Sequence, residues 1–169
     1  MVIKYVLAAI AATAVAACAA MGLVHQPAEG NQMKQSVTYL HLLRKTPFFT
    51  ALDRSQLKWV IDHSTEWEVG AGVEISNRLD GDYHLWVLLD GGWQVEQGGK
   101  VYPAGHADPA KWYGGAQAAL LPADSRLVAN QHSYVMRIAR ADFEQMLQQR
   151  FAFDAHLRQG EAFYAGLPR

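Results

Sequence analysis

Hydrophobic and polar positions divide the chain into three parts. Of the first 24 residues, 21 are apolar, which is far above the level of a soluble domain. Residues 25–32 are a short polar stretch that contains a proline and a glycine. From residue 33 onward, apolar positions recur first at helical spacing, then at strand spacing, and finally at helical spacing again. The pattern predicts a targeting or anchoring segment over 1–24, a linker over 25–32 and one folded domain over 33–169.

Two short helices are predicted at the start of the domain. The first contains Leu40 and Leu43 at helical spacing, and it ends before Pro47 because proline disfavours helical conformation in the residue that precedes it. The second follows Asp53 and Gln56, whose spacing is that of a capping box. The apolar stripe of this second helix consists of Leu57, Val60 and Ile61.

After His63 the chain changes to short apolar runs separated by glycine and aspartate turns, such as the one at 90–92. The predicted strands lie near residues 67–69, 73–75, 84–89, 93–95, 127–130 and 134–138. Helical spacing returns from Ala141 and continues into a C-terminal pair of helices. We therefore predict an α+β domain, in which an antiparallel, jelly-roll-like β-roll of about eight strands is flanked by N- and C-terminal helices.

Composition and charge exclude several classes of function. The 169 residues carry a formal net charge of −1, so there is no basic surplus to neutralise phosphates, and we expect no nucleic-acid partner. The one cysteine, Cys18, lies inside the apolar leader. The domain therefore has no cysteine for a disulfide, a thiolate zinc site or a nucleophile.

The leader has two interpretations, and both tether the domain to a membrane. Lys4 precedes an apolar run that ends in Val15-Ala16-Ala17-Cys18, which resembles a bacterial lipoprotein signal with Cys18 as the lipidated residue. The alternative is an uncleaved anchor helix, because the 20 residues of Tyr5–Val24 are about long enough to span a bilayer. The alanine-rich composition favours the lipoprotein. We expect the domain on the extracytoplasmic, periplasmic face of a bacterial membrane.

Five segments of the domain, in their order and spacing, resemble the cyclic-nucleotide-binding domain superfamily. They are Leu43–Leu52, Gln56-Leu57, Val69–Ile75, Tyr83–Gly92 and Arg140-Ala141-Asp142-Phe143. The resemblance covers Met33 to about Phe153, and it implies a β-roll with flanking helices. It also implies a phosphate-binding cassette, in which a glutamate accepts a hydrogen bond from the ribose hydroxyl and an arginine pairs with the cyclic phosphate.

The cassette of this chain departs from the family pattern at both charged positions. Counted from Gly115, the glutamate position holds Ala116, and counted from Pro122, the arginine position holds Ala123. Asp124 adds a negative charge, and Arg126 is the one nearby residue that could replace the missing cation. We assign to this degenerate ligand pocket Gly115, Ala116, Gln117, Pro122, Ala123, Arg126 and Trp86. The resemblance then implies an apolar pocket that has lost ordinary binding of cAMP and cGMP.

No catalytic constellation is found in the sequence, so we expect no enzymatic activity, no cofactor and no metal. A cupin-like metal enzyme is an alternative, but its first motif needs two histidines two residues apart, and here His84 is followed by Trp86. His106 and His132 are the other candidate ligands. The sequence favours a membrane-tethered regulatory or ligand-binding module of unknown ligand. The alternative is an accessory or assembly subunit that uses the roll to bind a membrane protein complex.

Overall fold

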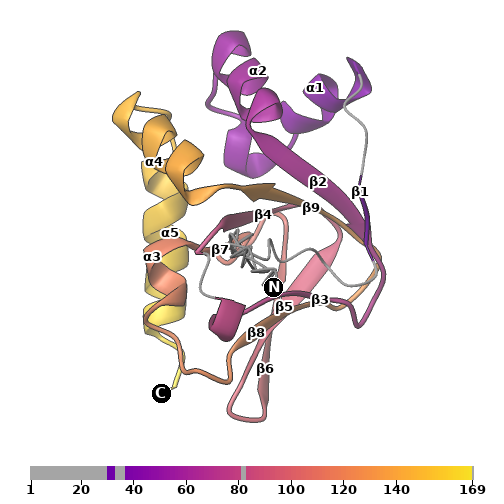
Figure 1. Cartoon of the computed structure of the whole chain (residues 1–169), viewed down its shortest axis with the longest axis vertical. Helices are drawn as coiled ribbons and strands as arrows, with labels where there is room; N and C mark the ends of the chain where they lie inside the picture. Colours follow the sequence, from indigo (N-terminus) through magenta and orange to yellow (C-terminus); the bar gives the residue numbers. More distant parts are fainter. Residues whose placement is uncertain (1–29, 33–36, 81–82, 169) are drawn as a thin grey trace, which may run out of the picture.

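Two antiparallel sheets form the centre of the computed structural model, which describes residues 30–32, 37–80 and 83–168 (Figure 1). The first sheet has the strand order β1 (Asn31–Gln32), β2 (Ser64–Val69), β9 (Ser133–Ile138), β4 (Leu85–Asp90) and β7 (Trp112–Gly114). The second has the order β3 (Glu74–Asn77), β8 (Arg126–Ala129), β5 (Gly92–Gln97) and β6 (Lys100–Gly105). The predicted α+β roll with about eight strands is therefore confirmed.

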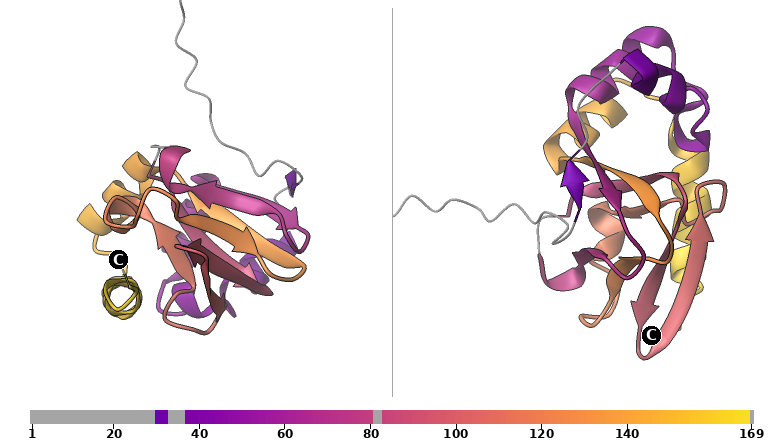
Figure 2. Two further views of the ribbon diagram at one scale, coloured as in Figure 1. Left: turned by 90° about the horizontal axis from the view of Figure 1, so that it is seen from below. Right: turned by 90° about the vertical axis from the view of Figure 1, so that its right-hand side faces the viewer.

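Helices flank the roll on its N- and C-terminal sides in the described residues, as predicted. The helical elements are α1 (Val37–Leu43), the 3₁₀ helices η1 (Pro47–Phe49) and η2 (Arg78–Asp80), α2 (Arg54–Asp62), α3 (Gly115–Ala118), α4 (Arg140–Gln148) and α5 (Asp154–Ala165). The predicted capping box is present at α2, where the Asp53 carboxylate accepts from the Gln56 amide at 2.9 Å and Gln56 Oε1 accepts from the Asp53 amide at 3.1 Å. In two views, α1, α2 and α4 lie at one end of the roll and the β5–β6 hairpin at the other (Figures 1 and 2).

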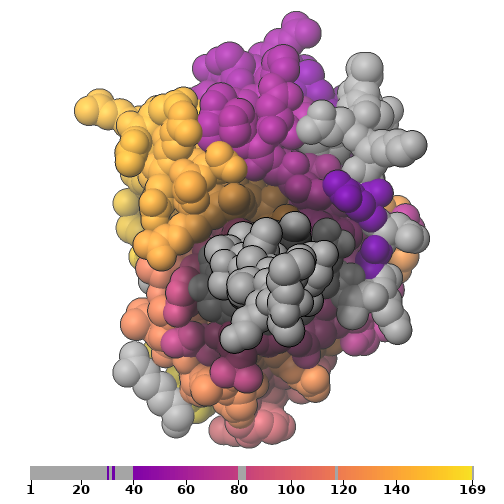
Figure 3. All heavy atoms as spheres, viewed as in Figure 1, coloured from indigo at the N-terminus to yellow at the C-terminus, as the bar shows by residue number. Residues whose placement is uncertain are grey.

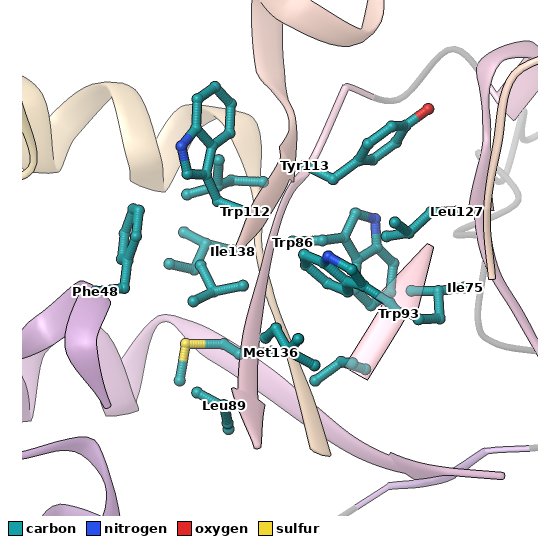
Figure 4. Packing of buried hydrophobic residues seen from close by; sticks show 14 of the residues in the cluster. Phe48, Ile75, Trp86, Leu89, Trp93, Trp112, Tyr113, Leu127, Met136 and Ile138 are labelled. Carbon is teal, nitrogen blue, oxygen red and sulfur yellow. The ribbon is translucent and has the colours of Figure 1, made fainter. Parts of the chain in front are cut away.

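The first sheet lies between two hydrophobic layers, and its strand β4 is buried on both faces. Five consecutive residues of β4, Leu85 to Leu89, are buried. Figure 4 shows Trp86 with Trp93 and Leu127 on the side that faces the second sheet, and Phe48 and Ile138 on the side that faces the helices. The roll is therefore filled with large aromatic side chains.

The structure adds to the prediction at the N-terminal end of the domain. Asn31 and Gln32, the last two residues of the predicted linker, form β1 and pair with Glu68 and Trp67 of β2. The predicted leader over 1–24, including Cys18, lies outside the described residues. Within the described residues, no helix is long and apolar enough to cross a membrane.

Candidate functional site

The cassette begins with two glycines where β7 passes into α3. Gly114 has a φ of +111° and Gly115 a φ of +56°, values that L side chains rarely adopt. The Gly115 amide donates to the His84 carbonyl at 3.2 Å, which fixes the turn against the segment that enters β4. The start of α3 is therefore set by backbone geometry.

The cassette presents small side chains where the family resemblance implies charged ones. Ala116 and Ala123 are both exposed to solvent. Pro122 is half-buried and lines a cavity of about 50 Å³ with Leu121 and Tyr164. The side chain of Gln117 lies outside the described part of the structure. Neither of the two positions that carry a charge in the family cassette thus offers a carboxylate or a guanidinium to a ribose phosphate.

Arg126 lies on the outer face of the second sheet, in ion pairs with two glutamates. Its Nη2 lies 2.6 Å from Glu96 Oε2, and its Nη1 lies 3.5 Å from Glu74 Oε2. Hydrogen bonds from the Gln94 amide and from Arg126 hold the pKa of Glu96 below its ordinary value. Successive side chains of a strand point to opposite faces, and the next residue, Leu127, is buried in the roll. Arg126 therefore points away from the interior.

Two further residues of the assigned pocket region have structural partners. The Asp124 carboxylate accepts from the Gly98 amide at 2.8 Å, so it holds the β5–β6 turn. Trp86 is 1% exposed and its ring lies 5.6 Å from that of Trp67 inside the roll. Trp86 lines neither the small cavity at Pro122 nor the larger groove at α3.

The structure brings to the cassette a cation that the sequence analysis did not single out. Arg78 of η2 donates to the Ala119 carbonyl at 3.2 Å and to the Tyr83 hydroxyl at 3.4 Å, and its guanidinium lies 5.8 Å from the centre of the Tyr83 ring. Its Nε is buried without a hydrogen-bond partner in the described residues. Since 41 residues separate Arg78 from Ala119, no local pattern indicates this contact.

A groove of about 500 Å³ lies between α3 and α4. Figure 3 shows α4, in orange at the upper left, as part of the molecular surface. Its lining residues are Tyr83, Gly115, Ala116, Ala119, Arg140, Phe143, Glu144 and Leu147. This volume is in the range of small-molecule sites, and the lining is largely apolar. The cassette helix therefore contributes to a groove outside the roll.

Helix α5 packs on β7 through Trp112. The Trp112 indole donates to the His156 carbonyl at 2.9 Å, and the Tyr164 hydroxyl donates to the Trp112 carbonyl. Burial raises the pKa of Tyr164 well above its ordinary value. Burial also lowers the pKa of Lys111, and burial together with the Lys111 charge lowers the pKa of His156. The hydrogen bonds of Trp112 and Tyr164 fix the C-terminal helix against the strand that leads into the cassette.

The three histidines of the cupin alternative occupy separate environments. His106 lies 3.6 Å from Asp90, the His132 Nε2–H donates to the Glu68 carboxylate at 2.7 Å, and His84 precedes β4 beside Gly115. Across the described ranges, no three side chains of histidine, cysteine, aspartate or glutamate gather at one point.

The fold is similar to solved structures of cyclic-nucleotide-binding domains and related sensors. The cAMP-bound protein PfPKA-R matches 76% of this chain at 18% identity and a TM-score of 0.58. The sensor domain of the transcriptional regulator DNR from Pseudomonas aeruginosa matches 75% at 14% identity and a TM-score of 0.55, over 93% of that chain. The regulatory subunit of a cAMP-independent protein kinase A from Trypanosoma brucei matches 77% at 19% identity and a TM-score of 0.54.

This chain spans 44% of the PfPKA-R chain and 49% of the Trypanosoma brucei chain. No protein-family model and no curated protein matches the sequence. At these identities the likeness shows the fold alone, a β-roll like that of cyclic-nucleotide-binding domains.

Proposed function

We propose that this chain is a non-enzymatic, membrane-tethered regulatory or ligand-binding module that has lost ordinary binding of cAMP and cGMP. The observation that carries the proposal is the position of Arg126, which is paired with Glu96 and Glu74 on the outer face of the roll. With Ala116 and Ala123 at the two charged positions, the cassette lacks the groups that recognise a cyclic nucleotide in the family. The cAMP-independent regulatory subunit from Trypanosoma brucei, of similar fold, supports a regulatory role without this ligand.

We expect no binding of cAMP or cGMP to the full chain in the micromolar range. A charge-assisted pair between arginine and phosphate contributes a few kcal/mol in a partly buried pocket, so its loss costs on the order of a hundredfold in affinity. Isothermal titration calorimetry of the chain in lipid nanodiscs, with empty nanodiscs as the blank, measures this. Micromolar binding that disappears in Arg126→Ala or in Arg78→Ala would contradict the proposal, because one of these cations would then replace the missing arginine.

The tether is tested at Cys18. If Cys18 is lipidated, the mature protein lacks residues 1–17 and carries acyl mass, and Cys18→Ser leaves an unprocessed precursor. Mass spectrometry of the membrane-extracted protein distinguishes the two forms. An intact Met1 with an unmodified Cys18 in the mature protein would contradict the lipoprotein and favour the anchor helix.

The second candidate function is an accessory subunit of a membrane complex, and exposed leucines favour it. Leu79 is 80% exposed and Leu120 is 63% exposed, and the contact between their neighbours Arg78 and Ala119 brings the two segments together. Exposed apolar side chains of this size are common at protein interfaces. Copurification of a membrane complex with the wild-type chain, lost in Leu120→Asp but retained in Val101→Asp, would favour this alternative over the first.

A further inference from the structure

Charge is distributed unevenly between the N-terminal helices and the rest of the domain. Residues 37–62, which contain α1 and α2, have four Lys and Arg against two Asp, a net charge of +2. Residues 63–169 have nine Lys and Arg against 13 Asp and Glu, a net charge of −4. Because α1 and α2 lie at one end of the molecule (Figures 1 and 2), the folded domain has a basic end.

Three of the four cations at this end have no counterion among the described residues. Arg44, Lys45 and Arg54 are exposed, and their side chains form neither an ion pair nor a hydrogen bond within 30–32, 37–80 and 83–168. Both aspartates act inside the helical segment, where one caps α2 and the other lies 2.6 Å from Lys58. The positive charge of the basic end is therefore available to a partner outside the chain.

The cations lie around an apolar groove of about 400 Å³ between α1 and α2. Its lining residues are Leu40, Arg54, Ser55, Lys58 and Ile61. Arg54, Lys58 and Ile61 are at positions i, i+4 and i+7 of α2, so they share one side of the helix. Arg44 follows Leu40 by one turn, since the Arg44 amide donates to the Leu40 carbonyl at 3.3 Å. We call the α1–α2 face the surface formed by Leu40, Arg44, Lys45, Arg54, Lys58 and Ile61.

A leader in the membrane would hold the domain close to the bilayer. Residues 25–30 separate the leader from β1, and six residues span at most about 20 Å when extended. A domain on so short a tether has its faces at a high effective concentration near the lipid. Because the α1–α2 face is basic and the rest of the domain is acidic, an anionic bilayer attracts the first and repels the second.

We propose that the α1–α2 face contacts the surface of an anionic phospholipid bilayer, with its four cations at the lipid phosphates. This inference rests on the proposed membrane tether, and it gives the tethered domain one orientation. Each cation near an anionic surface strengthens the contact about fivefold, and the effect falls off within a Debye length. The apolar groove between the cations adds a surface that the glycerol region of the lipid can contact.

Two lysines of the face and one distant lysine report on the contact. The full chain is incorporated into nanodiscs of phosphatidylcholine or of an equal mixture of phosphatidylcholine and phosphatidylglycerol, and mass spectrometry follows the acetylation of each lysine by an amine-reactive ester. Lys45 and Lys58 should react at least about fivefold more slowly in the anionic nanodiscs, because lipid covers them. Lys100, which is exposed on β6 at the other end of the molecule, should change less than about twofold. High salt should remove the difference, because it screens the charges.

A neutralised variant tests which side chains carry the contact. Arg44→Gln/Arg54→Gln leaves both reporter lysines in place and should reduce their protection to less than about twofold, because two of the four cations are gone. Arg150→Gln/Arg158→Gln removes two exposed cations near and on α5, so it is the matched control and should keep the full protection. Circular dichroism and the melting temperature establish that each variant is folded.

Failure of the tether and failure of the face give different results. A chain that does not incorporate into phosphatidylcholine nanodiscs contradicts the tether, and the same acetylation with added vesicles of the two compositions then tests the face alone. Equal rates at Lys45 and Lys58 in the two lipids would overturn the proposal in favour of an acidic protein partner. A slowing of Lys100 equal to theirs, or equal protection in the two double variants, would also overturn it.

Discussion

The variant Gly114→Ala is expected to lower the free energy of unfolding by about 3 kcal/mol or more, enough to unfold a marginally stable domain. A Cβ at this position would lie 1.9 Å from the His84 carbonyl oxygen and 3.0 Å from the His84 carbonyl carbon. Both atoms belong to the backbone, and Gly114 pairs with Leu85 across the sheet, so neither side can move without breaking the β4–β7 pairing. The φ of +111° adds strain that an L side chain does not tolerate.

The neighbouring glycine is the matched control for this substitution. Gly115 also has a positive φ, +56°, but a Cβ there would meet no atom within 4 Å. Gly115→Ala should therefore cost about 1 kcal/mol, which is the usual strain of a non-glycine residue in the left-handed region. Urea unfolding of the two variants and the wild type measures the difference. Equal losses would mean that backbone conformation decides the cost, and the close approach of His84 contributes nothing.

The elements that the sequence predicts are those with a strong local signal. The capping box at Asp53 and Gln56 and the glycine turn at 90–92 each specify a conformation within four residues. Strands β6 and β7 have no such signal. β6 contains Pro103 and exposes three of its six residues at a sheet edge. β7 has three residues, all buried, which is too short to show alternation. Helix α3 has four residues, which are too few to show apolar positions recurring at helical spacing.

The sequence predicts which residues form the cassette, but it does not predict how their side chains are arranged in space. The resemblance locates the cassette and the loss of its charges at Ala116 and Ala123, because these are properties of single positions. The partners of Arg126 depend on strand register, since Glu96 lies opposite it across the β5–β8 pair. The groove depends on two segments far apart in the chain, α3 and α4, and the contact of Arg78 with Ala119 spans 41 residues. Such contacts follow from the tertiary fold alone.

The second large effect concerns the packing of α5 on β7. Trp112 is 2% exposed, and its indole both fills the interface and donates to the His156 carbonyl. Trp112→Ala should therefore lower the free energy of unfolding by about 4 kcal/mol, from lost burial, a cavity and one lost hydrogen bond. Trp59→Ala is the control. Trp59 is half-buried at the edge of the helical layer, so this variant should lower the free energy of unfolding clearly less than Trp112→Ala does. If urea unfolding gives the same loss of free energy for both variants, the contact of Trp112 with α5 does not contribute more to stability than the packing of Trp59.

The close approach of α5 to this indole makes a sharper test, because the effect of one substitution should change sign with the residue at 112. A Cβ at Gly160 would lie 2.3 Å from Trp112 Nε1 and 2.5 Å from Cε2. Gly160→Ala alone should therefore destabilise by about 2 kcal/mol, although alanine is the better helix former by about 1 kcal/mol. Trp112→Phe removes the atoms that the new methyl group meets, so in that background Gly160→Ala should be neutral or stabilising. In a Trp59→Phe background, the cost of Gly160→Ala should stay unchanged. The free energies of unfolding of the four proteins in the Trp112–Gly160 cycle measure this coupling. If Gly160→Ala costs the same with tryptophan and with phenylalanine at position 112, the contact between Gly160 and Trp112 does not determine the position of α5.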